Sequence, residues 1–194
     1  MIDEAGLIET FESRRRQLRM RLILAGLITL GYGGLVGWGI AFGWLAAYLV
    51  LQFLEYRLEV KAGADGGALE PWRVRAALAI LLANGVVFAG FALLSPLTYG
   101  AWGMANGAFI MAGSVLNVAV SNRNKTSFLV SLIPYAVCFP LLAMASYYIG
   151  ASWPVTLSLL ISGPMILGPT ILLGPGTAFK GAMIACRLAA TTCD

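Results

Sequence analysis

Six long apolar blocks dominate this sequence and constrain its fold more than any other feature. They cover residues 22–37, 39–56, 74–94, 97–120, 127–149 and 153–174. A helix needs roughly 20 apolar residues to cross the hydrocarbon core of a bilayer. Only 11% of the residues are charged, whereas soluble domains carry about 25%. The sequence therefore predicts an all-α, polytopic membrane helix bundle of six transmembrane helices.

Three connections between the blocks are short and uncharged. Gly37, Trp38 and Gly39 are predicted to form a tight turn between the first two blocks. Ser95 and Pro96 end the third block, and 150–152 precede the sixth. The first two blocks are short and almost continuous, so the distribution of charge must decide whether they are separate helices.

All 13 Lys and Arg residues lie in four segments that alternate with these uncharged connections. Five precede the first block, four separate the second from the third, two separate the fourth from the fifth, and two follow the sixth. Lys and Arg concentrate in cytoplasmic loops of membrane proteins. The alternation predicts an even number of spans with both termini cytoplasmic.

The chain outside the spans divides into two cytoplasmic segments around a transmembrane domain at 22–176. Residues 1–21 form a basic lead in which Leu7, Phe11, Leu18 and Leu22 recur at helical spacing. Residues 177–194 are predicted to form a helical tail. Glu55 and Arg57 stand at a helix end, where we expect both to reach water. Anionic lipid is the expected partner of the arginines in the lead, Arg14, Arg15, Arg16, Arg19 and Arg21.

The residue types present argue against an enzyme. The chain contains no histidine, which removes histidine-ligated metals and haem and the histidine-based nucleophile systems. Cys138, Cys186 and Cys193 have no metal-binding spacing. We predict no catalytic, cofactor-binding or metal-binding residue and no nucleic-acid partner. Ion-coupled carriers usually bury an ionisable group along their pathway, and the centres of the blocks contain none, which leaves a small neutral-solute facilitator or channel as an alternative.

Polar and small residues recur at helical spacing along the fourth block: Asn106, Gly113, Asn117 and Ser121. Asn84 in the third block is their expected partner. Gly103 and Gly107 add a pair of small residues that favours close helix packing. The favoured interpretation is a hydrogen-bonded helix interface, and the alternative is the polar lining of a ligand pocket.

The last block combines glycine with proline at three steps, which end in Pro164, Pro169 and Pro175. Proline removes a backbone donor and bends a helix. A static kinked helix is the favoured interpretation, and a hinge that moves with a signal is the next. Met183, Ile184 and Leu188 place an apolar strip on the tail, which predicts pairing with a second copy in a homodimer.

The arrangement as a whole resembles a known type of membrane region. A basic lead (SRRRQLRMRL) precedes an aromatic second span (GWLAAYLVLQFLEYRL), and GSVLNVAV leads into a polar loop (SNRNKTSF). A Pro/Gly-rich last span then runs into the tail FKGAMIACRLAATTCD. The pattern resembles the N-terminal membrane input region of bacterial sensor histidine kinases, especially the hybrid kinases of alphaproteobacteria.

The resemblance implies a signal-input module of a two-component system in a bacterial plasma (inner) membrane. Such kinases continue into a helical hairpin with a phospho-accepting histidine and then an ATP-binding domain. This sequence has no histidine, so no kinase residue is carried over, and no enzymatic activity is expected of this chain.

Overall fold

The computed structural model describes residues 4–58, 69–122 and 124–173, with the backbone alone at 96–102 and 173. Within these ranges all regular structure is α-helical. The helices are α1 (Glu4–Arg16), α2 (Leu18–Val36), α3 (Trp38–Arg57), α4 (Pro71–Ser121), α5 (Lys125–Tyr148) and α6 (Trp153–Leu173). The prediction of an all-α fold is thereby confirmed.

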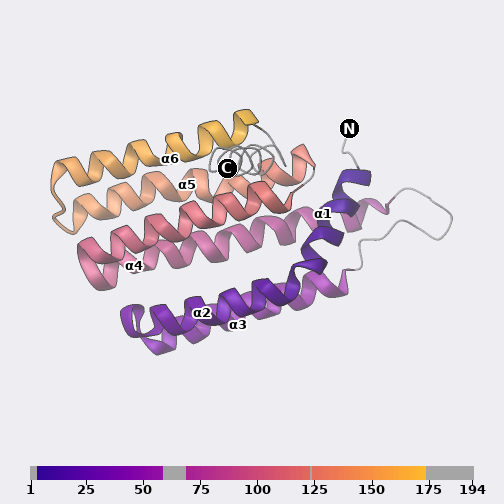
Figure 1. Ribbon diagram of the computed structural model, residues 1–194, viewed down its shortest axis with the longest axis horizontal. Helices are drawn as coiled ribbons and strands as arrows, with labels where there is room; N and C mark the ends of the chain where they lie inside the picture. The colour runs from indigo at the N-terminus through magenta and orange to yellow at the C-terminus, as the bar shows by residue number, and fades with distance from the viewer. Residues whose placement is uncertain (1–3, 59–68, 123, 174–194) are drawn as a thin grey trace, which may run out of the picture.

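Helix α4 folds back on itself, although the helical backbone continues through all of its 51 residues. Figure 1 shows its first half running to one end of the bundle and its second half returning beside it. A Cβ built on Gly107 would lie 2.5 Å from the carbonyl oxygen of Ala92, so the two halves are in contact there. The predicted break in the helix at Ser95 and Pro96 is wrong, but the predicted reversal of direction is correct.

Six segments of the described chain are long and apolar enough to cross a membrane. They are Leu18–Val36, Trp38–Arg57, Pro71–Ser95, Gly103–Ser121, Lys125–Tyr148 and Trp153–Leu172, in good agreement with the six apolar blocks. The first begins four residues earlier than predicted, so Arg21 lies inside a span. The shift is possible because a buried carboxylate offsets the charge of Arg21, as described below.

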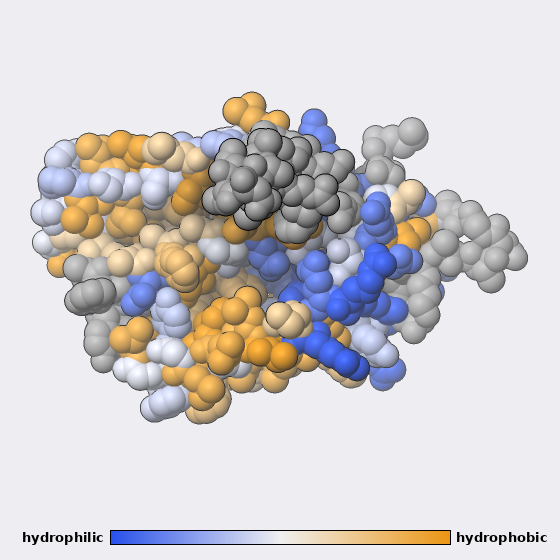
Figure 2. Space-filling model, viewed as in Figure 1, coloured by the Kyte–Doolittle hydropathy of each residue, from blue (hydrophilic) through white to orange (hydrophobic). Residues whose placement is uncertain are grey.

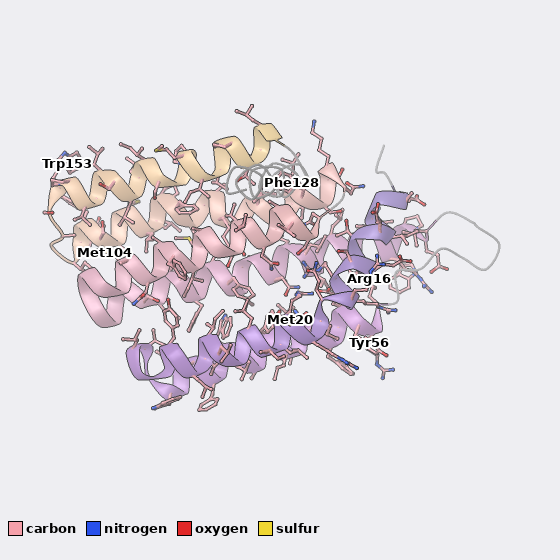
Figure 3. The ribbon with its side chains drawn as sticks, in the orientation of Figure 1. Arg16, Met20, Tyr56, Met104, Phe128 and Trp153 are labelled. Atoms are coloured by element: carbon pink, nitrogen blue, oxygen red, sulfur yellow. The ribbon has the colours of Figure 1, made fainter. Side chains whose placement is uncertain are left out.

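The bundle has a charged end and an uncharged end. Helix α1, the start of α2, the end of α3, both ends of α4 and the start of α5 meet at one end (Figure 1). Hydrophilic residues gather there in the space-filling view (Figure 2), while apolar residues dominate the middle of the face in view. Figure 3 places Arg16 and Tyr56 at the charged end and Met104 and Trp153 at the other. Charge segregation along the sequence thus becomes segregation in space.

Helix α1 packs against the bundle through one apolar face. Leu7 and Phe11 are fully buried and share a small core with Val74, Ala77 and Leu81 of α4. The opposite face of α1 is polar, with Glu12 and Arg16 exposed. The helical spacing of Leu7 and Phe11 therefore corresponds to a face that is buried against protein. Leu18 and Leu22 lie in α2 instead, where both are half-buried.

The turn between α2 and α3 depends on one glycine, not on the predicted three residues, because Trp38 already begins α3. Gly37 has φ 90° and ψ 136°, a conformation that costs a residue with a side chain about 1–3 kcal/mol. We expect Gly37→Ala to lower the free energy of unfolding by that amount, measured by denaturant titration in mixed micelles. Gly39→Ala is the control, because Gly39 is helical with open space at its Cβ. Equal stability of the two variants would contradict the prediction.

Candidate functional site

Glu55 in the last turn of α3 is the centre of a buried charged cluster. Arg14 binds its carboxylate with two bonds, Nε to Oε1 and Nη2 to Oε2, each 2.8 Å long. Arg21 donates from Nη1 to Oε1 over 3.1 Å. The exposed fractions of the three residues are only 5% for Glu55, 5% for Arg14 and 8% for Arg21. The prediction that Glu55 reaches water is therefore wrong.

The helix boundaries explain why both arginines reach the same carboxylate. Arg14 lies on the face of α1 that carries Leu7 and Phe11, so it turns inward with them. Helices α1 and α2 are separated at Gln17, and Arg21 lies in the first turns of α2. Burial lowers the pKa of Arg14, but the Glu55 carboxylate and its hydrogen bonds more than offset this and raise the pKa above its ordinary value. Arg14 therefore remains charged.

Two amides extend the cluster between α3 and α4. Asn84 donates to the carbonyl oxygen of Ile80 over 2.9 Å and to Glu55 Oε2 over 3.4 Å. Gln52, one turn before Glu55, donates to Asn84 Oδ1 over 2.9 Å. The bonds from Gln52 to Asn84 and from Asn84 to Glu55 connect α3 with α4, and the bond from Asn84 to Ile80 stays within α4. The charged cluster therefore joins α1, α2, α3 and α4 in one polar contact.

Two adjoining cavities lie beside the cluster. The smaller, of about 30 Å³, is lined in part by Arg14, Arg21, Asn84 and Tyr135. The larger, of about 210 Å³, lies between α2, α3 and both halves of α4. Five residues line both cavities: Arg21, Tyr48, Phe88, Ser114 and Asn117. Arg21 therefore contributes to the charged cluster and to the wall of the larger cavity.

The structure brings together some of the polar residues predicted from the sequence, and not others. Asn84 and Asn117 line the same small cavity. Ser121 Oγ donates to Asn117 Oδ1 over 3.1 Å and to Gln17 Oε1 over 3.2 Å, which links α4 to the break before α2. Asn106 precedes Asn117 by a length of about 16 Å along α4, at 1.5 Å per residue. There its backbone carbonyl oxygen accepts a hydrogen bond from the hydroxyl of Tyr32. Asn106 is thus separate from the other three.

The predicted hinge lies partly outside the described residues. Pro164 and Pro169 are exposed, and α6 remains helical through both. Pro175, Cys186, Cys193 and the tail at 177–194 fall outside the described ranges. Gly163 packs tightly on α5, since a Cβ there would lie 2.8 Å from Cβ of Phe139. Helix α6 is therefore anchored to α5 beside Pro164.

Sequence reasoning missed the charged cluster because its parts come from distant segments. Two local signals point to it in retrospect. Arg14 lies three residues after Phe11, on the apolar face of the lead that Leu7 and Phe11 define. Gln52 and Glu55 stand three apart at the end of an apolar block, again on one face. Neither signal alone identifies the partner.

An anion is the kind of ligand that the chemistry of this charged cluster would suit. Arg14 and Arg21 together exceed the charge of Glu55 by one unit, and guanidinium groups favour planar carboxylate and phosphate ligands. Among the described residues, no three His, Cys, Asp or Glu side chains gather as a metal site would require. No protein-family model, no curated protein and no solved structure matches this chain.

Proposed function

We propose that this chain is a signal-input module of a bacterial plasma membrane, with both termini cytoplasmic. The observation that carries the proposal is the ion-pair cluster of Arg14, Glu55 and Arg21. It fastens α1, which lies outside the spans, to helices that lie within them. A small shift of α3 against α2 changes the geometry at Glu55 and thereby the docking of α1. Interfaces of this kind switch between discrete arrangements.

The position of the site favours signal input over solute passage. Transporters place their binding sites near the middle of the bilayer, whereas this cluster lies at the charged end of the bundle. The larger cavity extends along α2 from Arg21 to Tyr32, about 16 Å at 1.5 Å per residue. This covers roughly half of a hydrocarbon core about 30 Å thick. The cavity is thus long enough to be part of a solute pathway but does not cross the membrane, so a neutral-solute facilitator is the second candidate.

The remaining parts of the proposal concern lipid and assembly. Arg16 and Arg19 are exposed, so they are the arginines of the lead that we assign to anionic headgroups, whereas Arg14 and Arg21 turn inward. The hinge predicted at Pro164, Pro169 and Pro175 and the homodimer predicted through residues 177–194 stay part of the proposal. Of these, Pro175 and 177–194 lie outside the described residues.

A fusion tests the input role. We expect residues 1–194, joined to the catalytic half of a sensor histidine kinase, to control its autophosphorylation in membrane vesicles. Arg14→Ala and Glu55→Gln both release α1, so both should change the rate in the same direction by about fivefold or more. Arg57→Ala is the matched control, because Arg57 is exposed one half-turn from Glu55 on α3.

Proteoliposomes test the alternative with the same chain. The input role predicts that glycerol and urea cross at the rate of empty liposomes. Saturable flux, together with an unchanged autophosphorylation rate in both cluster variants, would overturn the input role in favour of a facilitator.

A further inference from the structure

The larger cavity has a charged end and an apolar wall. Its lining includes polar side chains, while Leu24, Ile28 and Phe109 supply apolar surface. The polar side chains are Arg21, Asn117, Ser114, Tyr32 and Tyr48. Leu24 is 53% exposed and Phe109 76% exposed, so the cavity opens sideways between α2 and the second half of α4. The opening lies between the two candidate spans Leu18–Val36 and Gly103–Ser121. In a membrane this opening would face lipid, so a ligand would enter from the lipid and not from water.

The charged end has one positive charge in excess. Glu55 pairs with both Arg14 and Arg21, so among the residues that the structure describes one guanidinium charge in the cluster has no carboxylate of its own. A buried charge without full compensation costs several kcal/mol. A ligand with one negative charge would remove that cost. A carboxylate carries one charge, whereas a phosphate monoester carries about −1.5 to −2 at pH 7.

We propose that this cavity binds a single-chain amphipathic carboxylate from the surrounding lipid. The carboxylate contacts Arg21 and Asn117, and the first part of the hydrocarbon chain lies along Ile28 and Phe109. The volume of about 210 Å³ equals that of roughly seven water molecules in the liquid. The cavity holds only the headgroup and a short length of chain, and the rest leaves through the open side.

Occupancy of the cavity is coupled to the docking of α1. Arg21 donates to Glu55 and lines the cavity, so a bound carboxylate competes with Glu55 for the same guanidinium. Glu55 is then left to Arg14, the arginine that α1 contributes. This proposal rests on the input role because it names the signal, but binding is measured without any signalling output.

Trp44 provides a reporter for the cavity. The centroid of its ring lies 5.3 Å from the ring centroid of Phe88 and 5.8 Å from that of Tyr48, and both of these residues line the cavity. The full chain is placed in lipid nanodiscs with Trp44 as its sole tryptophan and phenylalanine at the other four positions. The probes are a dibrominated C18 fatty acid and the corresponding brominated alcohol, because bromine quenches indole fluorescence at short range. We expect saturable quenching by the acid and much weaker quenching by the alcohol.

Two variants locate the binding. Gly113 lines the cavity, and a Cβ built there meets nothing within 4 Å. Gly113→Leu should therefore occupy cavity space and abolish the saturable component. Gly90→Leu is its control, because Gly90 also has open space at its Cβ but lies outside the cavity lining. Arg21→Gln removes a charged hydrogen bond, so it should weaken acid binding about tenfold or more and cancel the preference over the alcohol.

Three results would overturn the proposal. The first is equal quenching by acid and alcohol. The second is quenching that Gly113→Leu leaves unchanged, as expected of a chain that is merely dissolved in the bilayer. The third is displacement of the acid by millimolar acetate, which would show a water-soluble anion as the ligand. Saturable acid binding without any effect on the kinase fusion would instead contradict only the input role.

Discussion

Glu55→Gln is expected to lower the free energy of unfolding by about 3–5 kcal/mol, because it leaves buried guanidinium groups without a carboxylate. Arg14 and Arg21 are both nine-tenths buried or more, so neither can recover full hydration without moving its helix. The glutamine can still accept one hydrogen bond but supplies no charge. The measurement is a denaturant titration of the full chain in mixed micelles, followed by tryptophan fluorescence.

The controls separate the buried pairs from a general effect of removing charge. Arg57→Ala, on the exposed side of the same helix, should stay within about 0.5 kcal/mol of the wild type. Arg14→Met combined with Glu55→Gln should cost less than the sum of the two single changes, because the first change removes one of the uncompensated charges. Additive losses, or a Glu55→Gln variant as stable as Arg57→Ala, would show that the cluster is not formed in solution.

The spans were predictable because their signal is local. A continuous apolar stretch of suitable length and an uncharged connection are read from neighbouring residues. The block at 97–120 is an example, since its second part forms the span Gly103–Ser121. The helical path through 96–102 was not predictable, because serine and proline at 95 and 96 usually end a helix.

The cluster was not predictable because its signal is not local. Arg14 and Glu55 are 41 residues apart in the sequence, and α1 must turn at Gln17 before they meet. Glu55 stands two residues from the end of α3, a place where a carboxylate ordinarily reaches water. Only the docking of Leu7 and Phe11 against α4 brings Arg14 over it. Tertiary packing thus reverses the expectation drawn from position alone.

The polar stripe of the fourth block shows the same division. Helical spacing identified the face, and Asn117 and Ser121 are indeed bonded to each other on it. The identity of the opposing helix depends on the fold, and Asn84 pairs with Gln52 and Glu55 of α3 instead of with the stripe. The glycines of this block also differ in role. Gly113 lines the larger cavity, whereas Gly107 packs directly against the backbone carbonyl of Ala92.

Gly107→Ala should destabilise the fold by about 1–3 kcal/mol, the usual cost of overpacking a close contact. A Cβ at this position would lie 2.5 Å from the carbonyl oxygen of Ala92 and 3.4 Å from Cδ1 of Leu142. The first neighbour is backbone, so it can move only if the two halves of α4 separate. Because Ala92 and Leu142 lie on different helical segments, Gly107→Val should cost more still. The measurement is the same denaturant titration.

Gly90→Ala is the matched control on the same helix, because nothing lies within 4 Å of a Cβ built there. Alanine is the better helix former by roughly 1 kcal/mol, so this variant should equal or exceed the wild type in stability. The two substitutions add the same methyl group to the same helix, and their expected effects have opposite signs. If Gly107→Ala also proved neutral or stabilising, Ala92 and Gly107 would not approach closely, and the reversal of α4 would require a different packing from the one in Figure 1.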